Sequence, residues 1–479
     1  MKTLTAFAAT IGVFATAFVA KQQTVPPGPR DRAELNAFLD SAVNAMMKRD
    51  RIPGAAVCFV RNGELFTCRG YGVSDIARKT PVSPDSTIWR IGSISKVFTA
   101  FGVVQLADQG RVDLNADVNR YLTSVKVKDT LGGPVLVEHL LDHTAGFDEI
   151  RPGTMAPNAA AVLPLGEFLR TRLVRVRSSG TTTSYSTYGM TLAGAMIEDV
   201  TKQSHERFLD SAVWAPLGMK STNVNVPASQ AHRVAIGYSV RGDSVLPEPW
   251  EWYLTTPASS VNSTARDMST FIIANLQLGR VGNARVLSQY ASRFMQRQHA
   301  TPHPRLPGFA LGFYEDYVGA LRTVEHAGDM AGFSALMVLI PEHNDGFFIV
   351  QHREGGSMRD ELKERILNRY YPASLVRLPV PAPPPDFRTR VGDFVGRFVP
   401  STSCHTCTPR SAPYIVSITA APDSSALMMS IARGRRFIEV APLLFVREDG
   451  SGYVAFRRGP SGTVTEMFVG NIWNFERVQ

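Results

Sequence analysis

A proline-rich stretch near residue 380 divides this 479-residue chain into two parts. Five of the seven residues from Pro379 to Pro385 are proline, which fixes φ and has no backbone donor. Neither a helix nor a central strand can pass through such a stretch, so we expect an extended, semi-rigid spacer. The chain is also too long for one compact unit. We therefore predict a large domain over residues 30–371, a linker over 372–386 and a smaller domain over 387–479.

The larger part mixes strand and helix patterns. Alternating apolar residues on both sides of Asn62-Gly63 predict a β-hairpin, and residues 97–107 are apolar nearly all round and stop before Gly110, which predicts a buried helix. An apolar strand pair follows at residues 333–340 and 347–351. These patterns predict one α+β domain with further helices between its strands.

The part after the proline stretch is rich in short β patterns, at residues 414–419, 426–431, 436–440, 453–456 and 464–469. Glycine, proline and aspartate separate them. We expect a small antiparallel β-sandwich or barrel.

The first twenty residues are typical of an export signal. Lys2 precedes an uncharged stretch that runs to Ala20, and Ala15-Thr16-Ala17 offers small residues for cleavage. We predict a signal peptide over residues 1–20 and a secreted or periplasmic protein, with an uncleaved N-terminal anchor as the alternative. No later apolar run approaches the length of a membrane span.

The charge balance does not indicate a nucleic-acid partner. Lys plus Arg exceed Asp plus Glu by 51 to 42, a net charge of +9, and no run of five like charges occurs. The excess fits solubility or an anionic cell surface.

The four cysteines form two close pairs. Cys58 and Cys68 flank the predicted hairpin turn, and whether they share a face depends on a register that the sequence leaves open. Cys404 and Cys407 have CxxC spacing, which in an exported chain favours a disulfide. A structural zinc site would need a second such pair, so we predict no metal.

Ser93 and Lys96 open the predicted buried helix. Residues three apart share a helical face, so the lysine amine lies within reach of the serine hydroxyl. A lysine can activate a serine only if burial lowers its pKa, and an apolar helix provides that burial. Such pairs also arise by chance, with the serine as a helix cap and the lysine extending to water.

Several ordered segments resemble one family: Ile52-Pro53-Gly54-Ala55, Arg90 to Lys96, Leu140 to Phe147, Tyr185 to Gly189, and His326-Ala327-Gly328. Together they resemble the serine hydrolases related to penicillin-binding proteins and class C β-lactamases, which include D-aminopeptidases and certain esterases. S-x-x-K belongs to this wider class. The resemblance spans most of residues 30–371 and implies no cofactor. The tail resembles, more loosely, the lipocalin-like barrel of some relatives.

The resemblance implies a role for each matched residue. Ser93 would attack the substrate and form the acyl-enzyme, and Lys96 would activate Ser93. Tyr185 would relay the proton to the leaving group and help to activate water. The backbone amides of Ser93 and Asp329 would form the oxyanion hole. The substrate would be a small molecule or a peptide, with cell-wall material as one source.

Three positions depart from the family pattern. Thr187 stands where the family usually has a substrate-binding asparagine, and His326, ahead of Ala327 and Gly328 on the substrate-binding strand, replaces a lysine. Asp329 puts a carboxylate beside the expected oxyanion hole, which would oppose an anionic transition state unless it points away. These changes favour an esterase or peptidase over an efficient β-lactamase. A non-catalytic cell-wall binding or sensing protein that keeps the fold is the alternative.

Other hydrolase chemistries have little support. Asp142 and His143 invite a triad with Ser93, but the resemblance implies a structural role for their loop. No G-x-S-x-G elbow, phosphate loop or H-E-x-x-H occurs.

Overall fold

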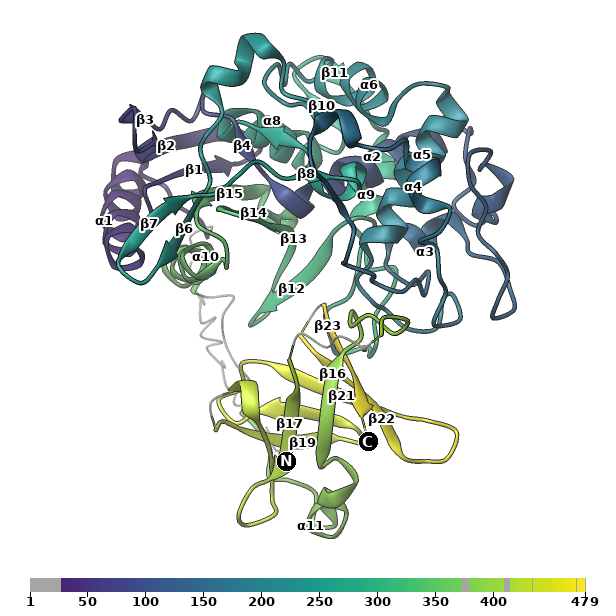
Figure 1. Cartoon of the computed structure of the whole chain (residues 1–479). Coiled ribbons are helices and arrows are strands. Elements are labelled where there is room, and N and C mark those ends of the chain that lie inside the picture. The colour runs from purple at the N-terminus through teal and green to yellow at the C-terminus, as the bar shows by residue number, and fades with distance from the viewer. Residues whose placement is uncertain (1–26, 373–378, 409–413, 433, 471, 479) are drawn as a thin grey trace, which may run out of the picture.

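The computed structural model describes residues 27–372, 379–408, 414–432, 434–470 and 472–478. The expected signal at residues 1–20 and part of the expected linker, 373–378, lie outside the described residues. Residues 379–384 form no helix or strand, as the prolines require. On either side of them lie a large mixed α/β body and a separate β-barrel, which Figure 1 shows below the larger body.

A seven-stranded antiparallel sheet forms the centre of the larger body, in the order β12-β13-β14-β15-β1-β2-β3. Its strands are β1 (Gly54–Arg61), β2 (Glu64–Asp75), β3 (Thr80–Pro81), β12 (Tyr314–Val318), β13 (Leu321–Met330), β14 (Phe333–Ile340) and β15 (Asp345–His352). The first and last parts of this domain therefore meet in one sheet, because β1 pairs with β15.

Both faces of the sheet are covered, so β1 is apolar along most of its length. Its odd-numbered residues from Ala55 to Phe59 pack into a core with the terminal helices α1 (Arg32–Asp50) and α10 (Ser357–Tyr370). Its even-numbered residues from Ala56 to Val60 join the larger core on the other face, which includes α8 (Ala265–Leu276). This division follows from the two-residue period of side chains along a strand.

A bulge in the hairpin decides whether its two cysteines lie on the same face. Asn62 and Gly63 form the two-residue turn, with φ of 52° and 73°. A register shift between Phe59 and Val60 then sets Cys58 directly opposite Cys68, and the two are joined in a disulfide. Cys404 and Cys407 form a second disulfide.

The helical half of the domain lies between β4 (Trp89–Arg90) and β12. The predicted buried helix is α2 (Ser95–Asp108), which ends before Gly110 at φ 70°. The other helices are α3 (Val137–Leu141), α4 (Leu165–Leu169), α5 (Thr187–Thr201), α6 (His205–Leu209), α7 (Thr256–Ser259) and α9 (Gln289–Gln296). Four short strand pairs connect the region: β4 (Trp89–Arg90) with β9 (Asn262–Ser263), β5 (Met155–Ala156) with β8 (Trp252–Tyr253), β6 (Tyr238–Arg241) with β7 (Ser244–Pro247), and β10 (Arg280–Val281) with β11 (Ala284–Arg285). No helix among the described residues is long and apolar enough to cross a bilayer.

The C-terminal part is a closed antiparallel barrel of eight strands, preceded by α11 (Phe387–Arg390). Its strands are β16 (Gly396–Pro400), β17 (Val416–Ala420), β18 (Leu427–Met429), β19 (Arg436–Ala441), β20 (Leu444–Arg447), β21 (Tyr453–Arg458), β22 (Val464–Val469) and β23 (Trp473–Val478). Of the two expected forms, sandwich and barrel, the structure has the barrel. The pairing of β16 with β23 closes it and leaves no sheet edge.

Candidate active site

Ser93 lies in a tight turn that packs against the end of β13, and this contact requires a glycine in each of the two segments. The turn is the 3₁₀ segment Gly92–Ile94, and Gly92 has φ 54°. A Cβ at Gly92 would lie 3.0 Å from the amide nitrogen of Asp329, and one at Gly328 would lie 1.9 Å from the carbonyl oxygen of Ile91. The end of β13 therefore packs directly against the serine turn, with the Asp329 amide beside it.

Lys96 follows one turn later and is almost fully buried, at 1% exposure. Its Nζ donates to Ser93 Oγ at 3.0 Å and to the carbonyl oxygen of Ala258 at 3.0 Å. Burial lowers its pKa to about 7, partly opposed by the negative charge of Glu149. This lowered pKa favours the unprotonated amine, the form that can accept a serine proton.

Tyr185 lies on the other side of the same pair. Lys96 Nζ is 4.8 Å from the centre of the Tyr185 ring, and the Ser93 side chain interacts with the Tyr185 hydroxyl. Burial raises the pKa of Tyr185 well above 10, against the smaller opposing effect of Ser93. Tyr185 therefore carries its proton at neutral pH.

Thr187 begins α5, and its backbone N–H donates to the carboxylate of Glu149 at 3.0 and 3.2 Å. The Glu149 side chain is buried, which raises its pKa, and its charge interacts with Lys96. Glu149 was not among the site residues predicted from the sequence. The only sequence signal was an acidic pair, Asp148-Glu149, directly after the Leu140 to Phe147 segment, and nothing there shows which carboxylate faces Lys96.

His143 packs against the ring of Tyr185 and accepts a hydrogen bond from the next residue. Its Nδ1 accepts the backbone N–H of Ser186 at 3.1 Å, and its ring lies 4.6 Å from that of Tyr185. Burial holds the pKa of His143 well below 6.5. Asp142 accepts from the backbone and hydroxyl of Thr144, at 3.1 and 2.7 Å. These contacts fit a structural loop and give no support to a triad with Ser93.

His326 lies where β13 runs past the end of β12, since their pairing stops at Tyr314 and Glu325. The His326 ring lies 6.0 Å from that of Tyr185. Burial, and secondarily the charge of Lys96, lower its pKa to about 3, so it is neutral at neutral pH. Its Nδ1 is 2.6 Å from the Ala327 carbonyl oxygen, and its buried Nε2 has no hydrogen-bond partner. The Ala327 N–H donates to Tyr314 at 2.7 Å.

The carboxylate of Asp329 is engaged by an ion pair and a hydroxyl group. Arg359 of α10 donates one nitrogen to each Asp329 oxygen at 2.9 Å, and Ser334 Oγ donates at 2.7 Å. The bidentate pair with Arg359 compensates the negative charge that the sequence puts beside the serine turn, and a remaining effect of that charge raises the pKa of Tyr185. Across the described residues, no group of three or more His, Cys, Asp or Glu side chains is arranged to hold a metal ion.

Comparison with known proteins matches residues 39–370 to the family described as Beta-lactamase. The chain is 26% identical to "Protein flp" of Staphylococcus aureus (strain MRSA252) over 321 residues, 65% of this chain and 62% of that protein. It is 28% identical to a "Beta-lactamase" of Providencia stuartii over 239 residues, 50% of this chain and 59% of that protein. The chain thus spans less than two thirds of the length of either relative.

Solved structures show the same fold. The "octameric penicillin-binding protein homologue from Pyrococcus abyssi" covers 93% of this chain and 100% of its own, at 18% identity and TM-score 0.61. The "Beta-Lactamase/D-Alanine Carboxypeptidase from Pseudomonas syringae" covers 70% of this chain and 99% of its own, at 22% identity and TM-score 0.60.

Proposed function

This chain belongs to the beta-lactamase family of serine hydrolases, and we propose that it is an exported esterase or peptidase that forms an acyl-enzyme at Ser93. One observation carries the proposal: the buried Lys96 amine lies 3.0 Å from the Ser93 hydroxyl with a pKa lowered to about 7. That geometry supports nucleophilic catalysis, because the serine has a base in place.

The acylation step follows from these contacts. Neutral Lys96 removes the Ser93 proton as Oγ attacks the substrate carbonyl, and the amides of Ser93 and Asp329 stabilise the oxyanion. Tyr185, which retains its proton, donates it to the leaving group. It regains a proton from Lys96, either directly or through water. Hydrolysis then reverses these roles, with water in place of the leaving group.

The charges at the site favour substrates without a carboxylate next to the scissile bond. His326 is neutral where the family has a lysine, so it gives a substrate carboxylate no ionic partner. Thr187 provides a hydroxyl in place of an amide. We therefore propose a neutral ester, or the amide of a D-residue, ahead of a β-lactam.

Two features support a location outside the cytoplasm. The leader-like residues 1–20 predict export, and two disulfides close short loops, which is typical of proteins that fold in an oxidising compartment.

Covalent labelling tests the proposal. An uncharged alkyl fluorophosphonate should add one adduct to the whole chain, located at Ser93 by peptide mass spectrometry. Ser93→Ala should take up none, while Ser95→Ala, which changes the other serine of the motif, should still be labelled at Ser93. Ser95 Oγ binds backbone atoms of Gly92 and Val261, so melting curves should accompany this control.

A three-substrate panel tests the substrate class: an aryl butyrate ester, a D-alanine anilide and a chromogenic cephalosporin. We expect kcat/KM to be highest for the ester or the anilide. Turnover of the cephalosporin above both would contradict the charge argument. A folded wild-type protein that is unlabelled and inert toward all three would favour the non-catalytic binding protein instead.

A further inference from the structure

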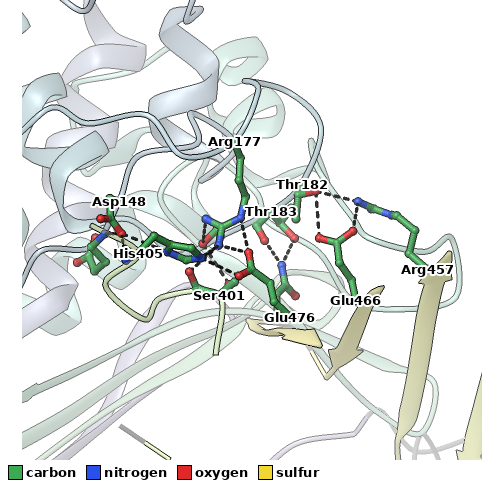
Figure 2. Close-up of polar contacts among 12 residues, drawn as sticks. Asp148, Arg177, Thr182, Thr183, Ser401, His405, Arg457, Glu466 and Glu476 are labelled. Atoms are coloured by element: carbon green, nitrogen blue, oxygen red, sulfur yellow. Dashed lines mark hydrogen bonds and ion pairs between the residues drawn. The ribbon is translucent and has the colours of Figure 1, made fainter. Parts of the chain in front are cut away.

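The C-terminal barrel docks on the larger body through a mainly polar contact surface. Figure 2 shows its labelled side chains: Asp148, Arg177, Thr182 and Thr183 of the larger body, and Ser401, His405, Arg457, Glu466 and Glu476 of the barrel part. Leu306 of the larger body adds an apolar contact, since it packs against Leu444, Ala455 and Phe468 of the barrel. Relative motion is expected of two domains unless their interface is large and hydrophobic.

The first docking contact is made by Asp148, the residue directly before Glu149. The fully buried Asp148 accepts the backbone N–H groups of His405 and Thr406, both at 2.9 Å, and the Thr406 hydroxyl at 2.7 Å. The Cys404–Cys407 disulfide closes the loop that presents these donors. The barrel therefore holds the residue next to the carboxylate that faces Lys96.

The second docking contact is made by Thr183 and Ser184, the two residues directly before Tyr185. The buried Asn474 amide donates to the carbonyl of Thr183 and to its hydroxyl, the latter at 2.7 Å. Ser401 Oγ lies 3.1 Å from Ser184 Oγ. The barrel thus holds the backbone that leads directly into the proposed proton donor.

We propose that the barrel is a positioning domain for acyl transfer, in which Asn474 and the loop around His405 hold Tyr185 and Glu149 in their places against Ser93 and Lys96. The inference rests on the proposed function, because it concerns residues of that site. In this proposal the barrel residues are positioning residues and not catalytic ones, because each acts through the loop that it holds. A misplacement of about 1 Å at reacting groups costs roughly 100-fold in rate.

Docking should also depend on pH through His405. Its Nδ1 lies 3.3 Å from Asp148 and its Nε2 lies 2.7 Å from Glu476, which Arg177 also binds. Burial and the charge of Arg177, whose Nη2 lies 3.2 Å from His405 Nε2, lower the pKa of His405, but its bonds to the two carboxylates outweigh both effects and raise it. Hydrogen bonds hold the pKa of both Asp148 and Glu476 low against burial, so both stay charged near neutrality. Docking is therefore favoured when His405 is protonated and weakens as pH rises through its raised pKa.

The test compares Asn474→Ala and His405→Gln in the full chain with Arg436→Gln, whose side chain pairs with Asp423 inside the barrel. One readout is hydrogen exchange of the backbone of residues 182–190, corrected for intrinsic rates, at pH 6 and pH 8. The second is the fluorophosphonate acylation rate constant, separated from the binding constant of the probe. Thermal unfolding identifies any variant that fails to fold.

We expect Asn474→Ala to raise exchange over residues 182–190 and to lower the acylation constant by about tenfold or more, with probe binding unchanged. Wild type should exchange faster at pH 8 than at pH 6, and His405→Gln should lose that difference. Exchange and acylation within twofold of wild type in both folded variants would overturn the proposal. If wild type takes up no label, the proposed function fails, and the exchange result alone then decides whether the barrel holds these loops.

Discussion

Replacing Gly328 with alanine tests the contact between β13 and the serine turn. The added Cβ would lie 1.9 Å from the Ile91 carbonyl oxygen and 3.0 Å from the Ser93 nitrogen, whereas carbon–oxygen contacts begin near about 3.3 Å. The strand and the turn must therefore separate by more than about 1 Å. Overpacking of this kind costs about 1–3 kcal/mol of unfolding free energy. A shift of that size at reacting groups costs roughly 100-fold in rate, so we expect Ser93 acylation to fall by about that factor.

The assay is the rate of inactivation by the fluorophosphonate, with thermal unfolding measured on the same sample. Gly392→Ala is the matched control, because a Cβ at Gly392 would meet nothing within 4 Å and its φ is not positive. It should acylate as wild type does. A Gly328→Ala protein that is folded and acylates within threefold of wild type would refute the reasoning, since the Asp329 amide would then not need its close approach to Ser93.

Two further predictions concern charge at the site. Glu149→Gln removes the negative charge that raises the pKa of Lys96, and it keeps an acceptor for the Thr187 N–H. The rise of the acylation rate with pH, centred near 7 in wild type, should therefore move to lower pH. A pH profile that does not move would contradict the coupling between Glu149 and Lys96. Arg359→Met leaves the Asp329 carboxylate uncompensated near the proposed oxyanion hole and should lower acylation about tenfold, equivalent to about 1.4 kcal/mol. The double variant with Asp329→Asn should recover most of the rate in the same inactivation assay.

Features encoded by neighbouring residues were predictable from the sequence. Residues 379–384 form no helix or strand because of a local backbone restriction, and the apolar helix after Ser93 follows from its own periodicity. The contact between Ser93 and Lys96 follows from their spacing of three residues, because the 3₁₀ turn that holds Ser93 runs directly into α2. The hairpin turn was also predicted, but the register of Cys58 and Cys68 was left open, because it depends on a bulge that no residue pattern marked.

Features that depend on distant residues were not predictable. The neutralisation of Asp329 requires Arg359, thirty positions later on a different element, and sequence spacing gave no reason to pair them. Glu149 approaches Lys96 only because the loop after α3 packs against α5. The barrel contacts with residues 148 and 181–184 join segments more than 200 positions apart. Each of these interactions is a product of tertiary packing.

The balance that sets the proton affinity of Lys96 also bears on substrate choice. Burial lowers its pKa and Glu149 raises it, while the neutral His326 contributes no formal charge where the family has a lysine. A substrate carboxylate bound near this group would add a second negative charge, raise the pKa of Lys96 and keep the base protonated. A neutral acyl group would leave the pKa near 7, and a cationic one would lower it. If Lys96 is the base, as we propose, the substrate charge would act on that base as well as on binding, and we expect both effects to favour an ester or a D-residue amide over a carboxylate-bearing lactam.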